Sequence, residues 1–331
     1  MKILFICNGS VKIGMGHITR CLTLASYMKK TNNCKITFLI QKSKSVIDYV
    51  KNYFQVISPP NDEISYVDWL IKKINSKKIN ILILDIRNDF KKKDLLKLKQ
   101  LTKIKIITID DSEEKRLASD IAFYPPVPQV NKMNWQGFDG LIFTGLEYSI
   151  LREEFLKEYP RKKNKSPILL VSMGGTDEKN LTTQVVKKLS DYKHQFDLLI
   201  IVGRDFPYIS ELKKALNLCS LEYQLKIDPT NVAATMAKAD FALISFGMTA
   251  YELYALKIPS LYLCLTKDHE ESSKLFEGLG CGRSLGNYSR INERDFNDIL
   301  SKFTHSKKHT FINENKISNM QKITSKILGE C

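Results

Sequence analysis

Directly after the apolar run Ile3–Cys7, the chain reads Asn8-Gly9-Ser10-Val11-Lys12-Ile13-Gly14-Met15-Gly16-His17-Ile18-Thr19-Arg20. The apolar residues that follow recur with helical spacing on one face of a predicted helix: Ile18, Cys21, Leu22, Ala25 and Met28. A short buried strand, a glycine-bearing loop and an amphipathic helix in this order indicate the first unit of a parallel α/β sheet covered by helices on both faces.

The same alternation of apolar strands and amphipathic helices continues outward from this segment. Before residue 160 the pattern predicts further strands at 36–40, 81–84 and 104–109. After residue 167 it restarts, with strands at 168–173, 198–202, 241–245 and 260–265 and helices near 181–189 and 250–256. The chain therefore contains two similar α/β units.

The stretch 159–167 separates these two units. It is charged, flanked by prolines and free of apolar residues between them, which is typical of an interdomain linker. A length of 331 residues also suits two domains of ordinary size. We expect an N-terminal Rossmann-like domain over residues 1–160 and a C-terminal one over 161–331, with the boundary between Glu158 and Pro167. A last helix is predicted at 315–328 and could pack back on the first domain.

The net charge is +15, most of it from lysine. Hydrophobic residues make up 43% of the chain, enough to form cores, so we expect a folded protein. Three interpretations of the charge are open. We favour a lysine-rich solvated surface; next comes a basic cleft that attracts an anionic substrate such as a nucleoside diphosphate. Nucleic-acid binding comes last, because no clustered basic–aromatic motif is present. A weak peripheral attraction to anionic membrane surfaces is also compatible with this charge.

The sequence predicts a cytoplasmic protein without a membrane-spanning segment. No stretch reaches the roughly 18–20 unbroken apolar residues of a membrane span, and the short run after Met1 lacks the features of a signal peptide. The seven cysteines are scattered, and neither they nor the five histidines have the spacing of a zinc site. We therefore expect free thiols in a reducing compartment, no metal and no cofactor.

The loop at residues 8–20 follows the first strand, and doubly wound sheets bind ligands at the carboxyl ends of their strands. Gly14 and Gly16 allow the backbone to approach a ligand closely. A dinucleotide fingerprint is not met, because Thr19 replaces its third glycine and no acid ends the second strand. His17 falls in the first turn of the helix, where the helix dipole disfavours imidazolium. It is therefore either a neutral general base or a histidine that closes the helix N-terminus.

Two further strand–turn–helix motifs lie in the second half of the chain. One is Ser172-Met173-Gly174-Gly175-Thr176-Asp177, which is either a ligand-binding turn or a glycine turn capped by Thr176 or Asp177. The other is Ser245-Phe246-Gly247-Met248-Thr249-Ala250-Tyr251-Glu252. Its helix start would direct free backbone N–H groups at a diphosphate, with Glu252 within reach of ribose hydroxyls. The alternative is a capped helix with a solvated glutamate in its first turn.

These motifs resemble those of a known family. Gly14-Met15-Gly16-His17-Ile18-Thr19-Arg20-Cys21-Leu22-Thr23-Leu24-Ala25 is similar to the opening signature of the UDP-sugar hydrolases of pseudaminic acid biosynthesis, which belong with spore-coat polysaccharide proteins. Gly145-Leu146-Glu147-Tyr148-Ser149-Ile150-Leu151-Arg152-Glu153-Glu154-Phe155 resembles the family's segment before its interdomain linker. The motif at 172–177 resembles the second glycine loop. The motif at 245–252, followed by Pro259, resembles the nucleotide-binding segment shared with MurG-type glycosyltransferases. The resemblance runs from Met1 to about Gly286.

The resemblance implies the GT-B fold, in which two Rossmann-like domains with parallel sheets face an interdomain cleft. It implies a UDP-sugar ligand, with UDP released by water and no metal needed. By the same resemblance His17 is the candidate general base, Gly247-Met248-Thr249 cradles the diphosphate, and Glu252 binds the ribose. The other candidate substrate- or nucleotide-binding residues are Gly14, Gly16, Arg20, Asp85, Arg87, Gly174, Gly175, Thr176, Ser245, Asp268 and His269.

Two positions depart from the family pattern, both where the sugar should lie. Asp85-Ile86-Arg87 stands in place of an Asp-x-Tyr group, and Asp268-His269 in place of an Asn-Gln pair. Arg87 either binds an acidic or phosphorylated group or is a surface arginine at a strand end. His269 either contacts the β-phosphate or the sugar or is a histidine at a helix N-terminus.

The sequence thus predicts a UDP-sugar hydrolase in which water attacks the anomeric carbon of a modified amino sugar, in surface-glycan biosynthesis of the nonulosonic acid type. A glycosyltransferase that uses the same site is the first alternative, and a non-catalytic nucleotide-sugar-binding or partner subunit is the second. The hydrolase would release UDP without an acceptor, the transferase would need one, and the binding subunit would release none. The identity of the sugar and the choice between UDP and CMP stay open.

Overall fold

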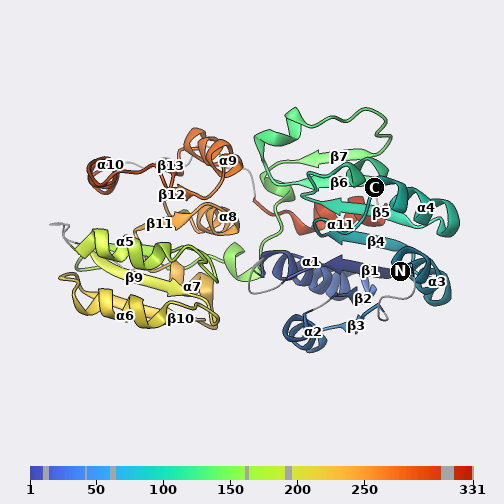
Figure 1. Ribbon diagram of the computed structural model, residues 1–331, viewed down its shortest axis with the longest axis horizontal. Coiled ribbons are helices and arrows are strands. Elements are labelled where there is room, and N and C mark those ends of the chain that lie inside the picture. The colour runs from blue at the N-terminus through green and yellow to red at the C-terminus, as the bar shows by residue number, and fades with distance from the viewer. Residues whose placement is uncertain are drawn as a thin grey trace. The chain divides into compact units, whose positions relative to one another are not determined.

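The computed structural model of the chain describes residues 1–9, 15–41, 43–59, 65–160, 164–190, 196–306 and 317–329, with the backbone alone at 293–295. It divides into two compact units, shown in Figure 1. The first is Met1–Ile150 together with Lys316–Cys331, and the second is Leu151–Asn315. Each unit is built around its own parallel sheet, as the restarted alternation of strands and helices predicts.

The sheet of the first unit has seven parallel strands in the order β3-β2-β1-β4-β5-β6-β7. Their bounds are β1 (Lys2–Cys7), β2 (Lys35–Leu39), β3 (Gln55–Ile57), β4 (Ile81–Asp85), β5 (Lys105–Ile109), β6 (Ile121–Tyr124) and β7 (Leu141–Thr144). The central strands are apolar on both faces because helices cover both faces. In β1, for example, Ile3 and Phe5 pack in one core cluster and Leu4 and Ile6 in another.

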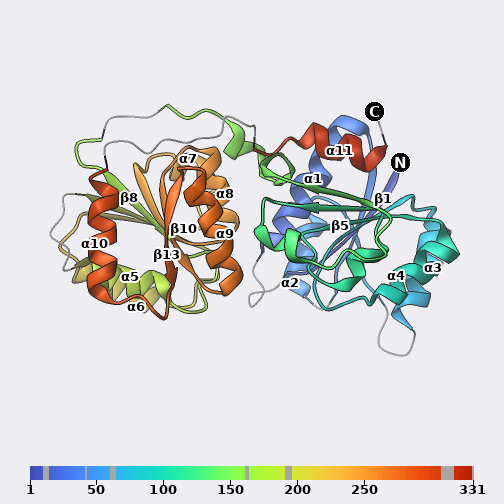
Figure 2. The same cartoon turned by 90° about the horizontal axis from the view of Figure 1, so that it is seen from above.

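Five α-helices of the first unit lie over this sheet: α1 (Gly16–Asn32), α2 (Lys44–Lys51), α3 (Tyr66–Lys77), α4 (Lys92–Thr102) and α11 (Met320–Leu328). The core clusters place α1, α2 and α11 on one face and α3 and α4 on the other, as Figure 2 shows. Short 3-10 helices occur at η1 (Glu114–Ala118), η2 (Pro128–Lys132) and η3 (Leu146–Tyr148). The first unit is therefore a doubly wound α/β layer structure.

The sheet of the second unit has six parallel strands in the order β10-β9-β8-β11-β12-β13. Their bounds are β8 (Ile168–Ser172), β9 (Asp197–Val202), β10 (Tyr223–Ile227), β11 (Phe241–Ser245), β12 (Ser260–Cys264) and β13 (Gly282–Asn287). The helices are α5 (Leu181–Ser190), α6 (Ile209–Asn217), α7 (Val232–Met236), α8 (Met248–Ala255), α9 (Lys267–Gly278) and α10 (Glu293–Thr304). Helices α5, α6 and α10 cover one face, and α7, α8 and α9 lie on the other (Figure 2).

The division between the units falls at Ile150 and Leu151, before the stretch 159–167 in which we expected it. The reason is the short 3-10 helix η4 (Glu153–Leu156), which contacts α7 and α8 of the second unit. Phe155 is completely buried, so the chain packs into the second unit before it reaches the charged stretch. Residues 161–163 of that stretch lie outside the described residues.

The end of the chain returns to the first unit through α11, within the stretch where the sequence predicts a last helix. Backbone N–H groups of Ser318 and Asn319 donate to the carbonyls of Leu146 and Glu147. Ile323 and Ile327 are fully buried in the first core. Lys105 Nζ donates to the carbonyl of Ile327 at 2.7 Å and so satisfies the helix C-terminus.

Each sheet reverses its strand order at one point, between β1 and β4 in the first unit and between β8 and β11 in the second. At such a point the loops leave neighbouring strands in opposite directions, which opens a crevice for a ligand at the carboxyl edge. The register pairs Cys7 with Asp85 at the first point and Ser172 with Ile244 at the second. The loop at 8–20, the group Asp85-Ile86-Arg87 and the two glycine motifs of the second unit follow these four strands.

Candidate functional site

His17 and Asp85 meet at the point where the first sheet reverses. His17 lies in the first turn of α1, and Asp85 is the last residue of β4. Nδ1 of His17 donates to Oδ1 of Asp85 at 2.6 Å, across 68 residues of sequence. The carboxylate is buried, whereas the imidazole is 23% exposed. With Nδ1 oriented by Asp85, Nε2 keeps its lone pair for a proton, an arrangement that suits a general base.

Arg20 lies one helical turn after His17 and neutralises Asp85. Its Nε and Nη2 donate to the two carboxylate oxygens of Asp85 at 2.8 and 2.7 Å, a bidentate pair. Burial by itself would raise the pKa of Asp85, but Arg20 and His17 outweigh it and hold the pKa well below its ordinary value. Burial would lower the pKa of Arg20, but Asp85 and Asp110 raise it. Both partners therefore stay charged inside the protein.

Asp110 extends this pair towards solvent. It follows β5, the strand beside β4, and adopts a left-handed backbone with φ of 53°. Its Oδ2 accepts from Arg20 Nη1 at 3.3 Å and lies 3.8 Å from Arg87 Nη2. Arg87 also donates to Ser112 Oγ at 2.7 Å and is 35% exposed. The arginine that replaces the family's tyrosine thus lies at the same sheet edge as His17.

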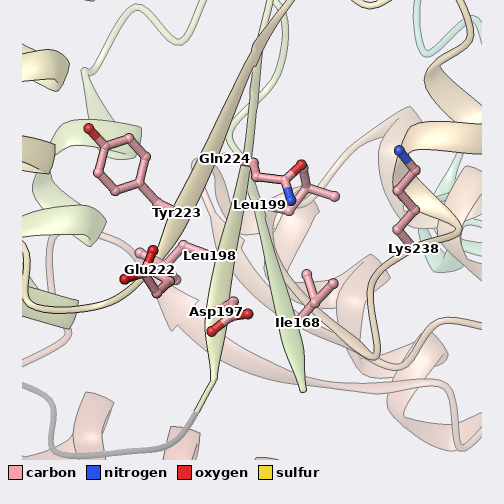
Figure 3. Close-up of a pocket in the computed structure, with 8 residues that line it drawn as sticks. All are labelled: Ile168, Asp197, Leu198, Leu199, Glu222, Tyr223, Gln224 and Lys238. Carbon is pink, nitrogen blue, oxygen red and sulfur yellow. The ribbon is translucent and has the colours of Figure 1, made fainter. Parts of the chain in front are cut away.

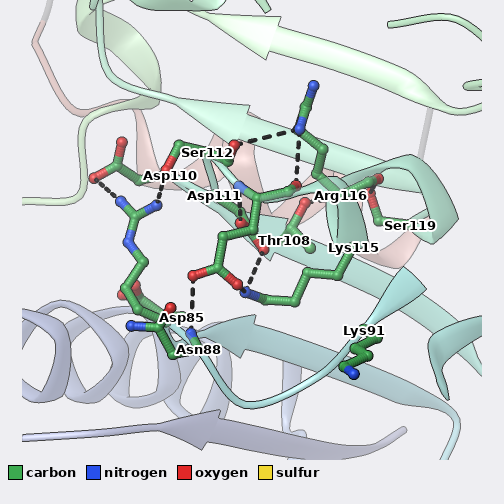
Figure 4. A network of polar contacts seen from close by, with 12 residues as sticks. Asp85, Asn88, Lys91, Thr108, Asp110, Asp111, Ser112, Lys115, Arg116 and Ser119 are labelled. Atoms are coloured by element: carbon green, nitrogen blue, oxygen red, sulfur yellow. Dashed lines mark hydrogen bonds and ion pairs between the residues drawn. The ribbon is translucent and has the colours of Figure 1, made fainter. Parts of the chain in front are cut away.

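Figure 4 shows the polar network that connects Asp110 with Asp111, Lys115 and their neighbours. Lys115 lies between Asp111 and Glu113, and Glu113 also accepts from the backbone of Asn88 at 2.8 Å. These contacts tie the loop after β4 to the loop after β5. Lys115 is completely buried, so within this network Arg87 is a cation that a ligand could reach.

The glycine-bearing loop before α1 is described only in part. Gly14 lies outside the described residues, and Gly16 is exposed as the first residue of α1. Among the described residues no side chain caps this helix, whose N-cap residue is Met15, and its first turn holds no acid. The backbone N–H groups of the first turn are thus not occupied by a capping side chain.

The two glycine motifs of the second unit adjoin each other. A Cβ placed on Gly174 would lie 3.9 Å from Oγ of Ser245, and Gly174 has a φ of +90° that favours glycine. The loop after β9 lies against the first of these motifs. A Cβ added to Gly203 would lie 2.3 Å from the carbonyl oxygen of Gly175, which is too close for any side chain. Gly175 is exposed and Thr176 is half-buried beside it.

Helix capping distinguishes the two motifs. The Asp177 carboxylate accepts from the N–H groups of Leu181 and Thr182 at 2.8 and 2.7 Å, so α5 is capped as one of the two interpretations of that turn expected. Helix α8 begins after Gly247, which offers no side chain, and its first turn holds no acid. Its free N–H groups, from the Met248 and Thr249 turn, therefore suit an anion.

Glu252 lies one turn into α8 with its side chain 14% exposed. Its Oε1 accepts from Arg152 Nη2 at 3.2 Å. Burial raises the pKa of Glu252, although Arg152 opposes that effect. Glu252 is therefore a paired, largely buried glutamate, and the expectation of a solvated first-turn residue does not hold.

Asp268 and His269 lie in the first turn of α9, whose N-terminus is capped by Thr266 Oγ1 through the N–H of His269 at 3.2 Å. The His269 ring packs 5.9 Å from the ring of Phe246, in the loop before α8. Burial lowers the pKa of His269, so the neutral ring is favoured. Asp268 is exposed. Both residues thus belong to the same edge as the α8 loop.

A pocket of about 240 Å³ lies at the other edge of the second sheet (Figure 3). Ile168, Asp197 and Tyr223, the first residues of β8, β9 and β10, contribute to its lining. Ligand sites of open parallel sheets lie at the carboxyl ends of strands, so this pocket is not the candidate site. Among the described residues, no helix is long and apolar enough to span a membrane.

Solved structures with the same architecture cover nearly the whole chain. MurG from Acinetobacter baumannii superimposes with a TM-score of 0.72 at 12% identity, over 99% of both chains. The UDP complex of MnaA from Staphylococcus aureus superimposes with a TM-score of 0.64 at 13% identity, over 100% of this chain and 97% of that one. Two parallel α/β sheets with loops at their reversal points define a protein of the GT-B class, as the resemblance implied.

Sequence relatives narrow this class. No family model matches the chain. A UDP-2,4-diacetamido-2,4,6-trideoxy-beta-L-altropyranose hydrolase from Campylobacter jejuni is 30% identical over 279 residues, which cover 82% of this chain and 95% of the relative. The spore coat polysaccharide biosynthesis protein SpsG of Bacillus subtilis is 25% identical, over 86% of this chain and 84% of the relative. An uncharacterized protein of Methanocaldococcus jannaschii is 33% identical, but the match covers only 55% of that longer protein.

The chain belongs to the family of these UDP-2,4-diacetamido-2,4,6-trideoxy-altropyranose hydrolases. The family resemblance stated from the motifs is thereby confirmed.

Three residues that take part in the candidate site, Asp110, Arg152 and Gly203, were not among the predicted site residues. Asp110 could have been found, because the sequence shows acids at the ends of two neighbouring predicted strands. Arg152 lies in the motif at 145–155, but no spacing links it to Glu252, 100 residues later. Gly203 gives no signal of its own, since only the approach of the Gly175 backbone requires a glycine there.

Proposed function

We propose that this chain is an enzyme that hydrolyses a UDP-linked amino sugar to UDP and the free sugar. Family membership supports this proposal, because the Campylobacter jejuni relative is named for such a reaction. The observation that carries it is the His17–Asp85 pair, a histidine whose Nδ1 is fixed and whose ring reaches solvent at a ligand-binding sheet edge. We place the enzyme in the cytoplasm, since the described cysteines are free thiols.

The proposed chemistry is a single displacement at the anomeric carbon. Nε2 of His17 takes a proton from water as the water oxygen bonds to that carbon. The bond from the carbon to the β-phosphate oxygen breaks, and its electron pair leaves with UDP. The free N–H groups at the start of α8 stabilise the negative charge that develops on the diphosphate. The proposed base lies in the first unit, and the proposed nucleotide ligands lie in the second.

The nucleotide assignment predicts that Glu252→Ala weakens UDP binding by about 1–3 kcal/mol, because a charge-assisted hydrogen bond to the ribose is lost. Isothermal calorimetry with UDP measures this directly. The matched control is Lys302→Gln, which breaks the exposed pair between Lys302 and Asp298 on α10 and should leave UDP affinity unchanged. Unchanged affinity in the Glu252 variant would rule out its role as ribose ligand.

We also propose that Arg87 meets an acidic group on the sugar, because its guanidinium is partly exposed at the edge that holds His17. Thermal stabilisation by a panel of UDP- and CMP-linked sugars, neutral and acidic, tests this, since at equal concentration a ligand that binds more tightly stabilises the protein more. Among sugar nucleotides with the same base, the parent should be stabilised most by one with a carboxylate or phosphate on the sugar. Arg87→Gln should lose that preference, by about tenfold in affinity, and keep its response to UDP alone. If the parent and Arg87→Gln are stabilised equally by every sugar nucleotide, Arg87 is a surface arginine that does not contact the sugar.

The same sugar nucleotides then separate hydrolysis from the alternatives. Release of UDP without an acceptor supports the hydrolase. Release only after an acceptor sugar is added would favour the transferase, and binding without release under either condition would favour a binding subunit.

A further inference from the structure

The segment at 145–155 resembles the family's segment before its interdomain linker, but the proposed reaction assigns it no role. Its first part serves the first unit, where the carbonyls of Leu146 and Glu147 accept the N–H groups that precede α11. Its second part serves the second unit. There Arg152 donates to Glu252 on α8, and η4 contacts the same helix. The contact between Arg152 and Glu252 therefore joins this segment to the proposed nucleotide site.

Arg152 is itself held in a fixed position. Its Nη1 lies 2.7 Å from Glu154 Oε1, and its guanidinium carbon lies 4.8 Å from the ring centre of Phe155, which is fully buried. This arrangement places a planar, permanently charged group beside the Glu252 carboxylate. Only one carboxylate oxygen of Glu252 accepts from Arg152 at 3.2 Å. A carboxylate has about four acceptor positions on two oxygens, so Glu252 can bind Arg152 and a ribose hydroxyl together.

Glu252 depends on this partner because it is largely buried. A buried carboxyl without a cation becomes neutral more easily, since removal from water penalises the charged form. The ionisable groups that act on Glu252 are Arg152, which favours its charge, and Glu154, which opposes it. Both come from η4. Without Arg152, Glu252 would face burial and a second carboxylate with no compensating charge.

We propose that Arg152 is a positioning residue of the nucleotide site, which fixes the Glu252 carboxylate and keeps it ionised for the ribose hydroxyls of a nucleoside diphosphate. The inference rests on the proposed function for its ligand, but the contact that carries it lies wholly within the second unit. Arg152 acts through Glu252, and this sets it apart from a residue that merely supports the fold.

The first experiment needs no nucleotide. Melting temperatures of Arg152→Met and of the double variant Arg152→Met/Glu252→Gln are compared from about pH 5 to pH 9. In Arg152→Met, we expect the pKa of Glu252 to be higher in the folded state than in the unfolded state. The stability of this variant is then fully present at low pH and is lost as pH rises through the folded-state pKa. The single variant should therefore fall below the double variant progressively with rising pH. A constant difference between the two variants would overturn the proposal.

The second experiment measures UDP affinity by calorimetry over the same pH range. Arg152→Met should bind UDP about tenfold or more weakly at low pH, as expected for loss of a charge-assisted hydrogen bond. The loss should shrink as pH rises and Glu252 ionises. Glu252→Gln should show a loss that pH does not relieve, and Arg152→Lys, which retains the charge, should recover most of the affinity. Lys302→Gln serves again as the control with an exposed pair removed.

The outcomes separate this proposal from the function on which it rests. If the parent binds no UDP, the proposed nucleotide assignment fails, and the melting experiment alone decides whether Arg152 keeps Glu252 ionised. If the parent binds UDP and Glu252→Gln weakens it, but Arg152→Met binds like the parent at every pH, the positioning role is overturned while the ribose assignment stands. A pH-dependent loss in Arg152→Met, relieved by Arg152→Lys, supports the proposal.

Discussion

His17→Asn is expected to lower turnover of a sugar nucleotide about a hundredfold to ten-thousandfold, the usual effect of removing a general base. Asparagine can still donate to the Asp85 carboxylate, so the local packing should persist, but it offers no nitrogen that accepts a proton at neutral pH. UDP affinity should stay close to that of the parent, because the proposed nucleotide ligands belong to the second unit.

The measurement pairs steady-state UDP release with calorimetry on the same protein samples, and the melting temperature is recorded for each. Thr23→Val provides a matched change on α1, since Thr23 Oγ1 bonds only the carbonyl of Thr19 in the preceding turn. Its turnover should match the parent. If His17→Asn retains near-normal turnover with normal UDP affinity, His17 serves only to close the helix N-terminus and another base must be sought.

Asp85→Asn is expected to lower the free energy of unfolding of the first unit by about 3–5 kcal/mol, because it leaves the buried guanidinium of Arg20 without its main counter-charge. Asp85 is 1% and Arg20 is 7% exposed, so water cannot replace the lost partner. Removing both charges with Arg20→Met/Asp85→Asn should restore part of the loss. If Asp85→Asn is as stable as the parent, the ion pair between Arg20 and Asp85 contributes little to the free energy of unfolding.

Both tryptophans of the chain, Trp69 and Trp135, lie in the first unit. Denaturant unfolding followed by tryptophan fluorescence therefore reports the unit that contains Asp85. Lys97→Gln is the matched control, since its pair with Asp68 is about half exposed on both sides. Breaking such a pair should change the unfolding free energy by less than about 1 kcal/mol.

The pH dependence of the same transition follows from the sign of the Asp85 pKa shift. The folded-state pKa lies below the ordinary value, because Arg20 and His17 outweigh the effect of burial. The stabilisation from ionised Asp85 is thus fully present above the ordinary aspartate pKa of about 3.9. It is lost as pH falls from there towards the folded-state value. Asp85→Asn should lack this part of the acid destabilisation of the parent.

The central strands of both sheets could be predicted because they are buried on both faces and therefore apolar throughout. The predicted strand at 241–245 coincides with β11, and those at 81–84 and 168–173 differ from β4 and β8 by one residue. Edge strands gave no such signal. In β7, Leu141 and Ile142 are exposed, and β10 and β13 consist mostly of polar or partly exposed residues. Strands covered on one side only need no apolar run.

The sequence by itself determined the class of the fold and predicted which loops carry the chemistry. The order of strand, glycine turn and helix is a local pattern, and His17, Gly247 and Glu252 are placed within it by spacing along the chain. The family signature then indicated the ligand. The sequence left two interpretations open for each glycine motif of the second unit, a ligand-binding turn or a capped helix. It could not decide between them because a capping hydrogen bond depends on the direction of a side chain.

Only the tertiary structure decided which residues act together. His17 bonds Asp85 across 68 residues, and Arg152 bonds Glu252 across 100. Such pairs arise because a parallel sheet aligns strands that are distant in sequence and brings their carboxyl ends to one edge. The order β1-β4 makes Asp85 a neighbour of His17, and the packing of η4 on α8 makes Arg152 a neighbour of Glu252. Strand order and helix packing are set by the burial of whole faces, which no single motif records.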